Sequence, residues 1–390
     1  MRQAWVAAGA VAAVVVIVAV MVFGKGTAHA LDLKVYRQGA RAVVGLARHR
    51  QSLYSFRTRD GLPFTYPPFA ALLMVPLAYV RFAVAVPIVR ALLAFAVAGL
   101  WQTSLRAAGY RVGWLVLTLL TAASLVLEPI YHDIQLGQMS LIIVLLVVAD
   151  LTGAVPPRYR GVLTGVAAGI KLTPLIFIPL FVLTRQWRAL VLTLGSFAAT
   201  VLIALAALPG ESWHYWTRYV RESSRVGSPW DLSDQSIRGV LDRVGAGQHS
   251  TAAELLLAFA QVIVVGSALV ISALWWRRGE RLLAVSLTGV AGLLASPISW
   301  PHHWCWVVPL LVALTRLSYL AAGLATVPYL ITLRLGVHFH WRDQVHHWDA
   351  VQNLIGNGYV WAALIVLTYA GWRLLREPRH PWRQHTPVPI

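Results

Sequence analysis

Cysteine and charged residues are scarce in this sequence. The chain has 390 residues and a single cysteine, Cys305, so no disulfide can form within it. Only 12% of its residues are charged and 58% are hydrophobic, whereas about a quarter of a soluble domain is charged. The apolar excess extends along the whole chain, which excludes a soluble domain with one anchor. Because each helical crossing of a bilayer takes about 20 apolar residues, the composition predicts a protein that crosses the membrane many times.

Acidic residues are also few, with 15 Asp and Glu against 33 Lys and Arg, for a formal net charge of +18. In a soluble protein this excess would suggest nucleic acid as a partner. Here the basic residues lie in short segments between apolar runs, where many of the 17 tryptophans also lie. Lys and Arg in such places meet anionic headgroups, and Trp prefers the membrane interface. We therefore expect membrane lipids, and no nucleic acid, as partners.

The motifs of soluble transferases are absent. The sequence has no Gly-x-Gly-x-x-Gly that opens a helix after a strand, no P-loop and no paired-cysteine zinc pattern. An enzyme that uses a nucleotide sugar would need a cytoplasmic domain with such a motif, and no segment is long enough for one. The donor of any transfer reaction is therefore expected to be a lipid-linked molecule that arrives within the membrane.

Apolar runs predict an all-α bundle of about 10–12 spans with one broken helix pair. The first run, residues 4–23, is long enough to cross, although residues 27–30 have the small-residue spacing of a signal-peptidase site. Its length favours a retained helix over a cleaved leader, with the N-terminus in the cytoplasm. Further spans are expected at 83–105, 112–127, 139–154, 187–208, 253–275, 281–298, 303–317, 318–335 and 358–373. Basic short links predict cytoplasmic termini, with a single catalytic domain over 1–375 and a basic tail at 376–390.

Two segments do not read as simple spans. Residues 161–184 have basic residues on both flanks, and Lys171 and Pro174 interrupt the middle. One crossing with both ends in the cytoplasm is impossible, so a hairpin of two half-helices with its tip near Lys171 is expected. Phe64–Phe69, which contains Pro67 and Pro68, leads into an apolar stretch that reaches Val80 and is too short to cross. It is expected to form a half-embedded helix on the outer side.

Most chemically useful side chains lie in the expected outer segments, which include a first outer loop at 24–66 and a second at 209–252. Ionisable groups at membrane depth are expensive and indicate function. Asp32 follows the first span closely and is the first candidate, because one carboxylate can act as a general base on an attacking hydroxyl. The alternative is a solvated aspartate at the start of a loop. Lys171 is the second candidate, with either a phosphate or the carboxylates of Asp133 or Glu128 as its partner.

Histidines and aromatic residues complete the candidate site. His132, Asp133, His302 and His303 could suggest a metal, but no His-x-x-His spacing is present and adjacent histidines are expected to diverge. Hydrogen bonds to phosphate or sugar oxygens are favoured, and no metal or cofactor is expected. A second histidine-rich loop, with His338, His340, His346 and His347, is interpreted as interfacial. In the stretch 211–243, aromatic and arginine side chains could bind sugar and phosphate, or form an amphipathic interfacial helix.

Six motifs in order resemble glycosyltransferase family 87, the actinobacterial polyprenol-phosphate-mannose-dependent mannosyltransferases of GT-C type. These motifs are Asp32–Tyr36, Phe64–Phe69, Gly137-Gln138, Gly169–Pro174, Asp234–Gly239, and Ser296–Trp300 with His302-His303. Each motif alone is weak, and the six together cover about residues 30–375. The stretch from Arg48 to Asp60 matches no motif of the family and leaves the acceptor open.

The resemblance implies an inverting transfer of mannose from polyprenyl-phosphate mannose to a mannoside of a glycolipid or lipoglycan, usually through an α-1,2 link. It implies Asp32 as the general base and an active site on the extracytoplasmic face of the plasma membrane. The substrate-binding residues that we expect are Arg37, Tyr66, His132, Asp133, Gln138, Lys171, Gln235, Arg238, His302 and His303. Two alternatives stay open: a related transferase that uses an arabinose or glucose donor, and a lipid-linked sugar transporter.

Overall fold

The computed structural model describes residues 26–46, 52–228, 230–244, 250–338, 347–376 and 388–389. The apolar run at 4–23, the loop at 339–346 and most of the basic tail lie outside the described residues, and so do the expectations made for them. The described chain is helical, apart from two-residue strands β1 (Tyr110–Arg111) and β2 (Val388–Pro389), which pair in parallel. A polytopic helical bundle of the expected class is therefore confirmed.

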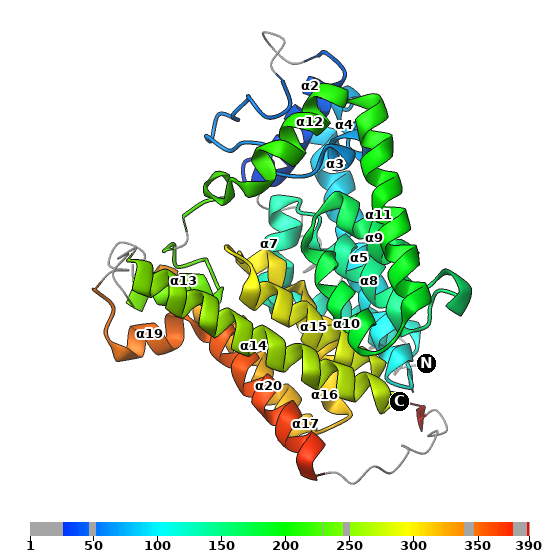
Figure 1. Cartoon of the computed structure of the whole chain (residues 1–390), viewed down its shortest axis with the longest axis vertical. Helices are drawn as coiled ribbons and strands as arrows, with labels where there is room; N and C mark the ends of the chain where they lie inside the picture. The colour runs from blue at the N-terminus through cyan, green and yellow to red at the C-terminus, as the bar shows by residue number, and fades with distance from the viewer. Residues whose placement is uncertain are drawn as a thin grey trace, which may run out of the picture.

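Five described helices are long and apolar enough to cross a bilayer. They are α5 (Phe82–Ala107), α11 (Trp187–Ala207), α14 (Thr251–Arg277), α17 (Tyr319–Thr326) with α18 (Pro328–His338) as one span, and α20 (Gly358–Arg376). A sixth crossing is possible through α6 (Trp114–Ala123), η2 (Ser124–Val126) and α7 (Glu128–Leu136), which bend by 86°. In Figure 1 the long helix α11 runs along one side of the molecule, and α14 and α20 slant across the other half.

The other expected spans are shorter helices enclosed by protein. These are α8 (Ser140–Thr152), α15 (Arg281–Ala295) and α16 (Val307–Thr315), the last preceded by η7 (Pro301–Trp306). Twelve of the fifteen residues of α15 are buried, and this helix packs against α14, α16 and α8. A helix that is surrounded by protein does not have to match the thickness of the bilayer.

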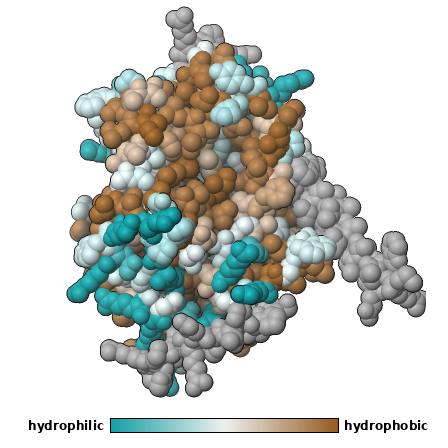
Figure 2. Space-filling view, turned by 90° about the vertical axis from the view of Figure 1, so that its right-hand side faces the viewer, coloured by the Kyte–Doolittle hydropathy of each residue, from teal (hydrophilic) through white to brown (hydrophobic). Residues whose placement is uncertain are grey.

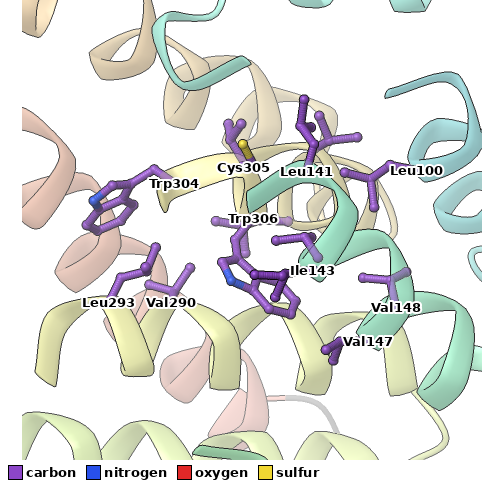
Figure 3. Packing of buried hydrophobic residues seen from close by; sticks show 14 of the residues in the cluster. Leu100, Leu141, Ile143, Val147, Val148, Val290, Leu293, Trp304, Cys305 and Trp306 are labelled. Carbon is purple, nitrogen blue, oxygen red and sulfur yellow. The ribbon is translucent and has the colours of Figure 1, made fainter. Parts of the chain in front are cut away.

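The core between these helices is filled by tryptophans and branched aliphatic residues. Trp306 lies against Gly289 of α15, where an added Cβ would be 2.3 Å from the indole ring. Figure 3 shows Trp306 between Val290 of α15 and Ile143 of α8, with Trp304 on the far side of Val290. Trp304 and Cys305 are fully buried. This packing fixes η7, whose first residues reach the candidate site.

Residues 161–184 form the expected hairpin. Helix α9 (Val162–Ile170) ends at Lys171, and η4 (Thr173–Ile176) and α10 (Phe177–Leu183) follow. Three glycines four residues apart pack against α11, where Gly161 meets Ala189 and Gly169 meets Thr200. In these contacts the residue numbers increase in the same direction along both helices, so α9 runs parallel to α11. Since a three-residue link joins α10 to α11, α10 returns antiparallel, and Lys171 lies at the tip.

The segment expected on the outer side after the first span is a folded cap. Helix α2 (Leu31–Val43) buries Leu33, Tyr36 and Gly39, and Gly39 lies against the ring of Phe64. The stretch expected as one half-embedded helix is instead two short ones, α3 (Pro68–Leu73) and α4 (Pro76–Tyr79), because Pro76 begins a second helix. Helices α2 and α3 pack on each other, and α3 also contacts α11.

The segment expected as the second outer loop contains short helices. They are α12 (Pro209–Thr217), η5 (Tyr219–Arg221), η6 (Ser223–Arg225) and α13 (Ile237–Val244), while η3 (Pro157–Tyr159) and α19 (Ala350–Gly356) lie in other links. Figure 1 shows α12 beside α2 and α4 at one end of the molecule.

Arginines gather where several helices end at the opposite side. Arg277 donates to the carbonyl of Leu183, and Arg278 donates to that of Leu374, so the ends of α10, α14 and α20 meet. Figure 2 shows apolar side chains over most of one face, with hydrophilic ones toward its lower end. An apolar belt of this kind is the surface that a bilayer requires.

Candidate active site

A cavity of about 760 Å³ opens between the segments expected as the two outer loops and the tip of the hairpin. Its walls come from α2, the segment 62–67, the end of α7, the hairpin tip at 171–173, the segment 215–233, residues 297–303 and α18. Residues from the beginning, middle and end of the chain therefore meet in one space.

Seven of the eleven expected site residues line this cavity: Asp32, Tyr66, His132, Gln138, Lys171, His302 and His303. The other four do not line it. Arg37 donates to the carbonyl of Val80, and Arg238 pairs with Glu254 at 2.9 Å. Asp133 is buried behind the wall and accepts the backbone N–H of Ser140. Gln235 donates to the carbonyls of Leu232 and Gly356.

Asp32 lies in the first turn of α2, outside the membrane spans. Its neighbours at i+1 and i+4, Leu33 and Tyr36, are buried in the core and fix the orientation of the helix. Burial raises the pKa of Asp32 to about 6, and the positive charge of Lys171 opposes that rise. A carboxylate with a pKa near 6 is ionised at neutral pH and is still basic enough to accept a proton.

Lys171 follows the last residue of α9 and has an extended backbone. It lies at the break of the hairpin and lines the cavity. Its Nζ atom lies 5.8 Å from the centre of the Tyr66 ring. Within the described residues, no ion pair joins Lys171 to Asp32, Asp133 or Glu128. Glu128 is instead bound by Tyr359 and by two backbone N–H groups of α18. Glu128 is therefore engaged away from Lys171, whereas the carboxylates of Asp32 and Asp133 act on Lys171 through their charges without an ion pair.

A buried hydrogen-bond network joins α2 to the opposite wall. The hydroxyls of Tyr36 and Tyr66 are 3.0 Å apart, and Tyr66 donates to Oε1 of Gln138 at 3.0 Å. Tyr36 also contacts that oxygen. On the other side of the amide, Nε2 of Gln138 lies 3.3 Å from Nε2 of His302. The helix that carries Asp32 is thus connected to the wall that carries the histidines.

The two adjacent histidines do not diverge as expected. Their ring centroids are 4.5 Å apart with the planes at 89°, and both rings line the cavity. Across the described ranges, no group of three or more His, Cys, Asp or Glu residues could hold a metal ion.

The part of the cavity wall formed by residues 297–303, which we call the histidine wall, is held in place by the segment 231–236. The backbone N–H of Ser299 donates to the Asp234 carboxylate at 2.7 Å, and the N–H of Gln235 donates to the carbonyl of Ser299. Arg243 donates to the carbonyls of Asp231 and Asp234. Burial raises the pKa of Asp234 to about 7 against the lowering effect of its hydrogen bonds and of Arg243. The motif that contains Gln235 therefore supports the cavity wall from behind.

Sequence reasoning missed several residues of the cavity. Glu222, Asp231, Trp300 and Thr173 line it and were not expected at the site. Trp300 and Thr173 lie inside quoted motifs, which was a usable signal. The two carboxylates lie in an arginine-rich stretch, where acidic residues read as partners of the arginines. Arg225, Tyr215 and Tyr219, from the aromatic and arginine stretch, also line the cavity.

Comparisons with known proteins identify the family of the chain. The family model of glycosyltransferase family 87 matches residues 64–297. A polyprenol-phosphate-mannose-dependent alpha-(1-2)-phosphatidylinositol mannoside mannosyltransferase of Mycobacterium tuberculosis is 32% identical, with 93% of this chain and 90% of that protein covered. A similarly named protein of Mycolicibacterium smegmatis is 32% identical over 87% and 83% of the two chains.

A third relative, from Mycobacterium tuberculosis, is named as a phosphatidylinositol pentamannoside mannosyltransferase. It is 34% identical over 73% of this chain and 66% of its own length. No solved structure matches the chain. The family model covers more than half of the chain, and the first relative covers nearly all of it. The chain therefore belongs to glycosyltransferase family 87.

Proposed function

We propose that this protein transfers mannose from polyprenyl-phosphate mannose to a mannoside acceptor, with inversion and formation of an α-1,2 link. The observation that carries the proposal is the cavity that Asp32 and Lys171 share without an ion pair between them. A base and a cation that face one space, with room between them, suit a reaction in which a hydroxyl attacks as a phosphate leaves. The names of the relatives supply the sugar and the acceptor class.

In the proposed reaction Asp32 removes the proton from the acceptor hydroxyl. The resulting oxygen forms a bond to the anomeric carbon of mannose. The bond from that carbon to the phosphate oxygen breaks on the opposite face, and its electron pair leaves with the polyprenyl phosphate. Lys171 stabilises the growing negative charge on the phosphate, and the histidine wall supplies hydrogen bonds.

Two further features of the proposal concern placement. The cavity is assigned to the outer side of the membrane, because the arginine-rich helix ends lie on the opposite side. The whole catalytic apparatus is assigned to one membrane domain, since residues from Leu31 to Val337 line the same cavity.

The test is transfer by the purified full-length chain, with labelled polyprenyl-phosphate mannose and phosphatidylinositol mannosides. Asp32→Asn removes the base and should lower kcat by about 10²- to 10⁴-fold, the usual contribution of general base catalysis, while donor binding persists. The matched control is Asp60→Asn, a carboxylate of the same outer loop that pairs with Lys34 outside the cavity lining. It should leave transfer unchanged.

Two outcomes would overturn this proposal. If Asp32→Asn transfers mannose at a rate similar to the parent, another group is the base. If the parent accepts polyprenyl-phosphate arabinose or glucose and not the mannose donor, the donor assignment is wrong.

A further inference from the structure

Gln138 is a buried amide at the junction between the cavity and the core behind Asp32. It is 2% exposed and is separated from the end of α7 by Gly137 alone. Gly137 adopts φ +72°, a left-handed conformation that glycine favours, and the backbone N–H of Gln138 returns to the carbonyl of Asp133 at 2.9 Å. This turn fixes the position of the Gln138 side chain.

The surroundings determine which end of the amide faces which neighbour. One end lies 2.8 Å from the backbone nitrogen of Met139. A backbone N–H can only donate, so the atom that faces it must be the oxygen. The hydroxyl of Tyr66 donates to the same oxygen, and Tyr36 contacts it as well. The amide NH₂ group is therefore the end that faces His302.

This orientation bears on where the proton of His302 resides. The Nε2 atom of Gln138 lies 3.3 Å from Nε2 of His302, and an amide nitrogen has protons to donate but accepts no hydrogen bond. In a hydrogen bond between these two atoms, the ring nitrogen of His302 is the acceptor and carries no proton. A neutral imidazole with an unprotonated Nε2 carries its proton on Nδ1.

We propose that Gln138 is a positioning residue that fixes His302 as the neutral Nδ1–H tautomer. His302 then offers one hydrogen-bond donor to a ligand in the cavity and adds no charge beside Lys171. This inference rests on the proposed function in one respect, namely that the ligand group served is the phosphate of the donor. The described lining of the cavity contains the cations Lys171 and Arg225. A neutral ring at His302 adds a hydrogen bond to the phosphate without a further positive charge, so the phosphate can still leave.

A double-mutant cycle tests the link between the two residues. We expect Gln138→Leu to lower kcat by about 10- to 100-fold and to change the KM for the donor much less, because hydrogen bonds to a leaving group strengthen as its charge grows. His302→Ala should cause a similar loss. If Gln138 acts through His302, the double variant should be within about threefold of His302→Ala alone.

Gln135→Leu is the matched control. It makes the same change at a buried glutamine three residues earlier, outside the cavity lining, and the thermal midpoint in detergent verifies folding of each variant. Losses that multiply in the double variant, or an equal loss of kcat in Gln135→Leu, would overturn the positioning role.

A second measurement does not depend on activity. Ring-¹⁵N histidine NMR of the full chain, as a difference between the parent and His302→Ala, reports the tautomer of His302 directly. We expect a protonated Nδ1 and an unprotonated Nε2. Gln138→Glu replaces the donor by a carboxylate and should move the proton to Nε2.

A protonated Nε2 in the parent would contradict the inference. The two proposals fail separately: a parent that does not transfer mannose refutes the proposed function, while the NMR spectrum still decides the tautomer.

Discussion

At the scale of single residues, Asp32 gives the reaction its expected dependence on pH. Burial raises its pKa to about 6, and only the ionised form can accept a proton. The ionised fraction therefore falls as the pH falls through 6, so kcat/KM should drop about tenfold per pH unit below that value and level off above it. Initial rates between pH 4.5 and 8 measure this fall, the acidic limb of the pH profile. A profile that is flat to pH 5 would contradict it.

Lys171 should set the position of that acidic limb. Its positive charge opposes the rise that burial imposes on the pKa of Asp32. Lys171→Met removes this charge, so the pKa of Asp32 rises and the limb moves to higher pH, in addition to a loss of rate from weaker phosphate binding. The pH profile of the residual activity measures the shift. A slower enzyme with an unmoved limb would show that the two charges are not coupled in the active state.

The same residues show what sequence could and could not predict at the site. Asp32 and Lys171 were predictable because a charged side chain beside an apolar run is costly to bury in the membrane, so its presence there indicates function. Gln235 and Arg238 lie in a quoted motif, yet they bind backbone carbonyls and Glu254 instead of lining the cavity. A motif fixes which residues are near a site, but loop geometry decides which of them face it.

At the scale of elements, the contact between α9 and α11 has no spare space. A Cβ on Gly165 would lie 2.0 Å from Oγ of Ser196 and 2.3 Å from the carbonyl oxygen of Thr193. Gly165→Ala must therefore push the helices apart, which typically destabilises a packed core by about 1–3 kcal/mol. We expect a lower thermal midpoint in detergent and reduced transfer, since α9 carries Lys171 at its end.

Gly195→Ala is the control for that substitution. Gly195 is an exposed position of α11, with nothing within 4 Å of an added Cβ, and alanine favours helix formation. Its thermal midpoint should equal or exceed that of the parent. Equal destabilisation by the two substitutions would show that the close contact at Gly165 is not what limits stability.

Helix lengths were the least predictable feature of the fold. The positions of the apolar runs predicted where helices occur, and the break at Lys171 was predicted from its flanking charges. Hydropathy could not show that α8 and α15 are short, since a helix enclosed by other helices is as apolar as one that faces lipid. Pro76 also divided a stretch that had been expected as one helix, because this proline begins a second helix.

At the scale of the whole molecule, sidedness can be tested with single cysteines. The native Cys305 is fully buried and should not react, so it can stay in place. Arg59→Cys lies exposed in the first outer loop, and Arg158→Cys lies exposed between α8 and α9. A membrane-impermeant maleimide should label residue 59 in intact cells and residue 158 only after permeabilisation.

The unmodified chain is the control, because it should not be labelled under either condition. The opposite pattern, with residue 158 reactive from outside, would place the cavity in the cytosol. It would also remove the proposed outer-surface reaction.

The cavity brings together a wall from the first helix after residue 30 and a wall that begins at Pro297. During synthesis, the segment with Asp32 is therefore made long before the residues from Pro297 onward that complete the cavity. A nascent chain that stops before Pro297 would lack the wall that carries His302 and His303, and that side of the cavity would stay open. Catalytic competence should thus arrive late in biogenesis, when the last part of the polypeptide packs.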